Sequence, residues 1–78
     1  MPTTQTTLDQ LQPGDQAKVL AIHGEPETAE RLMEMGLVVG TPLKVLKFAP
    51  LGDPMEIVIR GYHLTLRRAE AAGIRVEV

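Results

Sequence analysis

Apolar and polar positions alternate along the last third of the chain. Residues 55–60 alternate between apolar and mostly polar side chains, and residues 62–67 do the same after Gly61. A third alternating run covers residues 74–78. Side chains of a β-strand point to opposite faces in turn, so each run predicts a strand with one buried face. Because two runs meet at a glycine, we also predict a hairpin there.

Two further strands are predicted earlier in the chain. Residues 18–22 form a short apolar, partly β-branched run that reads as a strand, and residues 42–48 form a second one, with a proline tolerable at its start. Residues 49–54 form a loop with two prolines and one glycine. Single helical turns are expected at residues 8–11 and 68–72. The chain therefore contains about five short strands, and closure into a small barrel hides the edges of such strands.

One longer helix is predicted between these two strands. Ala29, Leu32 and Met33 stand at positions i, i+3 and i+4 and form one apolar face. A proline suits the first turn of a helix and a glycine suits its C-terminal cap. The helix is therefore expected over about residues 26–36, as an insertion into the barrel.

Two glycines are expected to shape the end of this helix. If Gly36 is the first residue after the cap, Leu37 and Leu32 make the apolar contact that accompanies a Schellman motif. The segment 38–41 then predicts a type II turn, with Gly40 at the position that needs a positive φ.

The composition is that of one small aliphatic domain. The chain has 78 residues, 44% of them hydrophobic, and its aromatic residues are Phe48 and Tyr62. The core must therefore be built from Leu, Val, Ile, Met and Ala. We expect this domain over residues 8–78, after a flexible N-terminal extension over residues 1–7. No signal-peptide pattern and no apolar run of about 18 residues is visible, so a cytoplasmic location is expected.

Charge and residue usage argue against several functions. Eight Lys or Arg against ten Asp or Glu is not the basic excess of a nucleic-acid-binding protein. Cysteine and serine are absent, which removes two common nucleophiles as well as disulfides and thiolate metal sites. Gly52-Asp53-Pro54 reads as a turn rather than a phosphate loop, because no helix beginning with Lys-Ser/Thr follows it. We therefore predict that the protein is not an enzyme.

Two histidines are weak candidates for a metal site. His23 and His63 lie 40 residues apart, and neither has a second ligand at a typical local spacing. Metal sites need three or four convergent ligands. We therefore predict no cofactor and no dedicated metal site, and at most a weak or adventitious divalent metal.

An exposed aliphatic surface is the remaining candidate for function. The candidate partner-binding residues are Met35, Leu37, Leu51 and Met55, since methionine suits adaptable contact surfaces. Met35 falls off the predicted apolar face of the helix and Leu51 lies at a loop tip, so exposure is expected for both. Ordinary core packing, or a single exposed apolar side chain, is the alternative for each of the four.

Three segments together carry a resemblance to a known family. They are RLMEMGL-x-x-G at residues 31–40, APLGDP at residues 49–54 and LR-x-x-EA at residues 66–71. In this order they resemble the FeoA family, the small cytoplasmic proteins that accompany the bacterial ferrous-iron permease FeoB. The resemblance implies an SH3-like β-barrel with a helical insertion, and a role in ferrous iron uptake.

The resemblance favours a non-catalytic adaptor that docks on the cytoplasmic part of FeoB and modulates transport. Such a protein reaches the inner face of the membrane only through its partner. Docking on a second copy of itself also stays open. Two alternatives remain: an iron-sensing or iron-carrying module, and an SH3-like regulatory or nucleic-acid-binding module.

Overall fold

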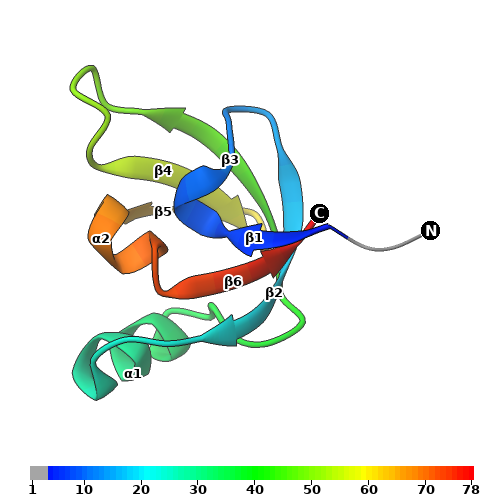
Figure 1. Cartoon of the computed structure of the whole chain (residues 1–78), viewed down its shortest axis with the longest axis vertical. Helices are drawn as coiled ribbons and strands as arrows, with labels where there is room; N and C mark the ends of the chain where they lie inside the picture. Colours follow the sequence, from blue (N-terminus) through cyan, green and yellow to red (C-terminus); the bar gives the residue numbers. More distant parts are fainter. Residues whose placement is uncertain (1–3) are drawn as a thin grey trace.

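The protein is built on one strongly curved antiparallel sheet (Figure 1). The computed structural model describes residues 4–78. The strands are β1 (Gln5–Thr7), β2 (Gln16–Ile22), β3 (Pro42–Phe48), β4 (Met55–Ile59), β5 (Tyr62–Leu66) and β6 (Ile74–Glu77). Their order across the sheet is β1-β6-β2-β3-β4-β5. The helices α1 (Pro26–Glu34) and α2 (Arg68–Ala71) and the 3₁₀ turn η1 (Leu8–Gln10) lie in the connections.

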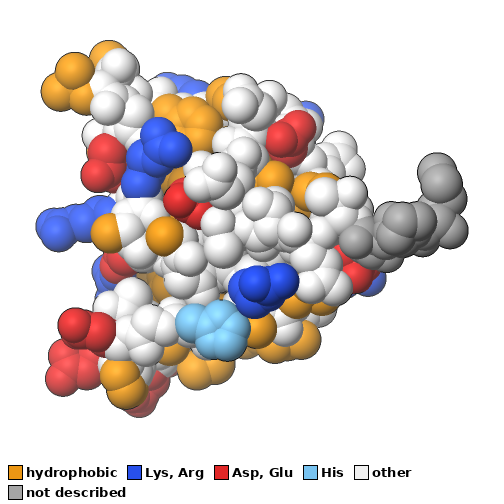
Figure 2. Space-filling model, in the orientation of Figure 1, with side chains coloured by type: hydrophobic (Ala, Val, Ile, Leu, Met, Phe, Trp, Pro, Cys, Tyr) orange, Lys and Arg blue, Asp and Glu red, His pale blue; other side chains and the backbone are white. Residues whose placement is uncertain are grey.

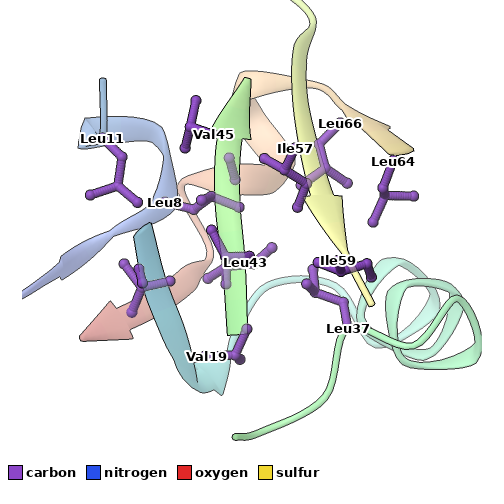
Figure 3. Close-up of a cluster of buried hydrophobic side chains, with 14 of the residues drawn as sticks. Leu8, Leu11, Val19, Leu37, Leu43, Val45, Ile57, Ile59, Leu64 and Leu66 are labelled. Carbon is purple, nitrogen blue, oxygen red and sulfur yellow. The ribbon is translucent and has the colours of Figure 1, made fainter. Parts of the chain in front are cut away.

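Strands β2 to β6 turn one face inward and fill a single aliphatic core (Figure 3). Strand β4 shows why, because Met55, Ile57 and Ile59 alternate with half-buried residues and are at most 1% exposed. The buried hydrophobic residues outside β4 are Leu8, Leu11, Ala17, Val19, Leu32, Leu37, Leu43, Val45, Leu64, Leu66, Ala71, Ile74 and Val76. Burying a large aliphatic side chain contributes about 1.5–3 kcal/mol, so this cluster is the main source of stability.

Two irregularities help the sheet to curve around this core. The register between β2 and β6 shifts between Val19 and Ala21, and the register between β3 and β4 shifts between Val45 and Lys47. A bulge bends its strand and increases the local twist. Both shifts lie in the middle of the sheet, where bending brings the inner faces of distant strands together.

The predicted hairpin is confirmed. Ile59 of β4 pairs with Tyr62 of β5, which leaves Arg60 and Gly61 as a two-residue loop. Both loop residues have positive φ, 46° and 86°. Positive φ at both central positions is typical of the tight turns that match the twist of a hairpin.

The N-terminal strand β1 was not predicted. The polar N-terminal sequence predicts a flexible extension over residues 1–7, whereas Gln5–Thr7 pairs with β6, with Thr6 opposite Val76. The sheet therefore has six strands rather than about five. The residues of β1 are polar, so no apolar pattern indicates a strand there. The strand is stabilised instead by pairing with β6, about 70 residues away in the chain. Residues 1–3 of the predicted extension lie outside the described residues.

The predicted end of the α1 helix is confirmed in detail. The N–H of Leu37 donates to the carbonyl of Leu32 at 3.0 Å, and the N–H of Gly36 donates to the carbonyl of Met33 at 3.0 Å. These are the two hydrogen bonds of a Schellman motif, and Gly36 has the positive φ, 98°, that the motif requires. The helical residues end at Glu34, two positions before the predicted limit.

Candidate partner-binding surface

Two of the four predicted contact residues belong to the core. Leu37 and Met55 are each 0% exposed. Leu37 directly follows the Schellman motif and belongs to the same core cluster as Leu32, and Met55 is the first inward position of β4. The assignment of these two residues to a contact surface was therefore wrong.

The environments of the two methionines at the end of α1 are the reverse of those that the sequence pattern predicts. Met33, predicted to be in the core, is 47% exposed. Met35, predicted to be exposed, is half-buried and packs against the core. At 3.6 residues per turn Met35 lies about 60° from Leu32 around the helix, whereas Met33 lies about 100° away. The apolar face therefore includes Met35, and little of its side chain remains for a partner.

Leu51 is the most exposed large apolar residue among those described. It is 97% exposed at the tip of the loop between β3 and β4, as the sequence predicted. Figure 2 shows apolar side chains at the tip of this loop, at the upper left of the molecule. A lone exposed leucine is common on protein surfaces. Leu51 differs from an ordinary exposed leucine in the ordered conformation of its loop.

The loop that carries Leu51 is held by its own backbone. The N–H of Gly52 donates to the carbonyl of Ala49 at 2.7 Å, and the N–H of Ala49 donates to the carbonyl of Pro54 at 2.9 Å. Gly52 has a φ of 88°, which a glycine adopts without strain. Leu51 is therefore displayed at the apex of a hydrogen-bonded turn.

A polar cleft of about 560 Å³ lies between α1 and α2. Arg31 of α1 forms an ion pair with Glu70 of α2 across it, and the second carboxylate oxygen of Glu70 accepts the N–H of Arg67 at 3.0 Å. Thr28 and Thr65 complete much of the wall. Each oxygen of the carboxylate thus has a partner, and Glu70 joins the two helices.

The two histidines do not form part of a metal-binding cluster. His23 follows β2 and His63 lies on β5, and strands β3 and β4 separate β2 from β5 in the sheet. Within residues 4–78 no group of three or more His, Asp or Glu side chains is arranged to hold a metal ion. The backbone N–H of His23 donates to the carbonyl of Gly73 at 2.6 Å, which joins the end of β2 to the start of β6.

The comparison with protein families decides the identity of this domain. The model of the FeoA domain matches residues 6–78, which is almost the whole chain. The chain belongs to the FeoA family. The three segments that carried the sequence resemblance are the end of α1 with the turn after it, the loop that carries Leu51, and the end of β5 with α2, and all three lie within the matched residues.

A curated relative of this FeoA-family chain is joined to a transporter. It is the Fe(2+) transport protein A/Fe(2+) transporter FeoB fusion protein of Porphyromonas gingivalis, 41% identical over 71 residues. The match covers 91% of this chain and 8% of that relative. The chain thus spans a small part of the relative, and the family is linked to ferrous iron transport through such a fusion.

Solved FeoA structures share the fold. The FeoA protein of Chlorobium tepidum is 51% identical, with a TM-score of 0.90 over 94% of this chain and 70% of that chain. FeoA of Stenotrophomonas maltophilia, solved with zinc and described as a prokaryotic SH3 domain protein, is 28% identical, with a TM-score of 0.79 over 91% of this chain and 88% of that chain. The SH3-like fold that the resemblance implied is therefore confirmed.

The helices of this FeoA domain are short. Within residues 4–78 neither α1, with nine residues, nor α2, with four, approaches the length of a membrane-spanning helix. FeoA is a transport-associated family and not a known enzyme family. We therefore look for the function of this domain in the surfaces through which it can contact a partner.

Proposed function

We propose that this FeoA-family chain is a non-catalytic accessory protein that docks on the cytoplasmic part of a FeoB-type permease and modulates ferrous iron transport. The observation that supports docking is the fusion of FeoA to FeoB in a relative 41% identical to this chain. Fusion gives two domains a high effective concentration, so even a weak contact between them is populated. Such a contact needs an accessible surface on the FeoA domain.

Leu51 is the residue that we assign to this contact. Of the four residues first considered, Leu37 and Met55 are buried and Met35 is half-buried, which leaves Leu51 accessible. A single aliphatic side chain at a protruding tip suits insertion into a pocket, which is how hot-spot residues bind. Domains that bind proline-rich peptides do so in a groove lined by aromatic residues. This chain has only Phe48 and Tyr62 from which to build such a groove.

Binding to FeoB tests the docking proposal. Calorimetry with full-length FeoB in detergent, and with its soluble nucleotide-binding domain, is expected to show saturable binding of the wild-type chain. Each titration is run with and without guanine nucleotide. Absence of binding in all four conditions would show that the docking proposal is wrong. Ferrous iron uptake in cells that lack the chain, with and without its restoration, measures the modulation.

A substitution at the loop tip tests the assignment of Leu51. Leu51→Asp is expected to raise the Kd for FeoB about 30-fold or more, as loss of a hot spot of about 2 kcal/mol does. Val39→Asp is the matched control, because Val39 is also an exposed apolar residue in a turn, at 68% exposure. If Leu51→Asp and Val39→Asp both bind FeoB as tightly as the wild-type chain, Leu51 is excluded from the contact.

An iron-binding role predicts a different result. The zinc in the Stenotrophomonas structure shows that a relative can be solved with a divalent metal. If this chain senses or carries iron, anaerobic titration with Fe²⁺ shows saturable uptake that His23→Ala or His63→Ala removes. Our proposal expects no such uptake.

A further inference from the structure

One arginine braces the loop that displays Leu51. The backbone N–H of Arg68, at the start of α2, donates to Oδ1 of Asp53 in the loop at 3.1 Å. Its guanidinium carbon lies 5.1 Å from the centroid of the Phe48 ring, at the end of β3. Arginine stacks on an aromatic face within about 6 Å. Arg68 therefore contacts the loop at both ends, just before it begins and just before it closes.

The middle of the loop also fits the arginine. A Cβ placed on Gly52 would lie 3.3 Å from Nη1 of Arg68, which is tighter than an ordinary contact. The glycine thus permits the positive φ of the turn and also leaves room for the guanidinium. Both roles belong to the residue directly after Leu51.

The same guanidinium reaches a third segment of the chain. Its Nη2 donates to the carbonyl of Asp9 in η1 at 3.2 Å. The segment η1 is itself anchored to the core, because its residue Leu8 is completely buried there. Arg68 thereby connects the loop to a part of the molecule that the core holds in place.

From these contacts we infer that Arg68 is a positioning residue, which holds the loop in the conformation that presents Leu51 as a preformed anchor. The partner surface that fits this anchor is an apolar pocket for one aliphatic side chain. The flanking groups support an apolar site, since Asp53 is engaged by Arg68 and Gly52 has no side chain. The identity of the partner, FeoB, rests on the proposed function.

A loop that is already ordered before binding is expected to bind its partner more tightly. A flexible loop loses conformational entropy when it binds, and that loss weakens the complex. A loop that is already ordered by the folded protein avoids this loss. Removal of the guanidinium contacts to Phe48 and Asp9 therefore weakens binding, although the backbone hydrogen bond to Asp53 remains and Arg68 itself need not touch the partner.

The first test measures the loop without any partner. Hydrogen exchange of the amides of Ala49 and Gly52, both donors within the loop, is expected to accelerate about tenfold or more in Arg68→Ala, as local opening becomes easier. Amides of β6 keep the wild-type rate, which separates local loosening from global unfolding. Arg67→Ala is the control, because Arg67 lines the α1–α2 cleft and makes none of these contacts.

The second test measures affinity for FeoB. Arg68→Ala is expected to raise the Kd about tenfold, whereas Arg67→Ala leaves it within about twofold; losses of this kind are typical when a contact loop is no longer preformed. With Leu51 already changed to Ala, Arg68→Ala has little further effect, because the anchor is gone. Arg68→Lys keeps the charge without the planar stacking group, so it restores only part of the affinity that Arg68→Ala loses.

The outcomes separate this inference from the proposed function. Unchanged exchange in the loop of Arg68→Ala would overturn the positioning role, whether or not FeoB binds. A loosened loop with undiminished FeoB affinity would overturn the anchor. If the wild-type chain fails to bind FeoB while Arg68→Ala loosens the loop, docking fails and positioning stands. Concentration-dependent self-association that Leu51→Asp abolishes would assign the anchor to a second copy instead of FeoB.

Discussion

At the turn between α1 and β3, one buried hydroxyl holds the backbone. Thr41 is 0% exposed, and its Oγ1 donates to the carbonyl of Gly36 at 3.1 Å and accepts the N–H of Val38 at 3.2 Å. The same turn is fastened to β2, because the N–H of Gly40 donates to the carbonyl of Val19 at 2.8 Å. Individual hydrogen bonds therefore fix the helical insertion to the sheet.

Loss of the Thr41 hydroxyl is predicted to destabilise the protein. Thr41→Val keeps the shape and removes both hydrogen bonds, so we expect the free energy of unfolding to fall by about 1–2 kcal/mol. Chemical denaturation measures this change. Thr65→Val is the control, since Thr65 is exposed on β5 and its change should stay within about 0.5 kcal/mol. Equal effects of the two substitutions would contradict the role of Thr41.

Gly73 shows a different reason for a glycine. It directly follows Ala72, the C-cap residue of the short helix α2. Its φ is not in the left-handed region, but a Cβ at this position would lie 2.6 Å from the carbonyl oxygen of His23. The backbone just after β2 and the backbone just before β6 approach too closely there for any side chain.

At the scale of the element, α1 shows how an amphipathic pattern can be assigned to two different faces. Leu32 lies in the core with either assignment. Met33 and Met35 flank it on opposite sides of the helix, and both are apolar, so the periodicity alone could not choose between them. The choice follows from how the cap at Gly36 and the turn after it dock the helix on the sheet.

The exchange of the two methionines can be tested directly. Met35→Gln places an amide against the core, and we expect the free energy of unfolding to fall by about 1–3 kcal/mol. Met33→Gln is the matched substitution on the exposed side, and its effect should stay within about 0.5 kcal/mol. Glutamine is uncharged and similar in length to methionine, so neither change disturbs the helix dipole. A larger loss for Met33→Gln would reverse the assignment.

At the scale of the whole molecule, the two ends of the described chain meet in the sheet (Figure 1). Strand β1 pairs with β6, and Nη2 of Arg75 donates to Oε1 of Gln5 at 3.1 Å. The N–H of Val78 donates to the carbonyl of Thr4 at 3.0 Å. Hydrogen-bonded pairs alternate along an antiparallel ladder, which assigns the N–H of Thr6 to the carbonyl of Val76.

Removal of this donor is predicted to weaken the fold. Thr6→Pro eliminates the N–H and we expect the free energy of unfolding to fall by about 1–3 kcal/mol, because the β1–β6 ladder loses its central bond. Thr4→Pro retains the carbonyl that accepts from Val78 and serves as the control. Thermal or chemical unfolding of the two variants gives the comparison. An unaltered Thr6→Pro protein would mean that β1 adds nothing to stability.

The sequence by itself determined the features that depend on neighbouring residues. The cap at Gly36, the turn at Gly40, the hairpin at Gly61 and the alternating strands follow from φ preferences and side-chain periodicity within a few positions. The family segments and the exposure of Leu51 are local in the same sense. No long-range information was needed for any of them.

Only the tertiary structure decided what depends on distant partners. Strand β1 exists because β6 is beside it, Met35 is covered because α1 docks in one orientation, and Arg68 acts as a brace because Asp9 and Phe48 converge on it. These partners lie far apart along the chain, where short-range patterns carry no information about proximity. The sequence therefore predicted only the exposed loop tip of the proposed contact surface, while the contacts of Arg68 to Asp53, Phe48 and Asp9 were found in the folded chain.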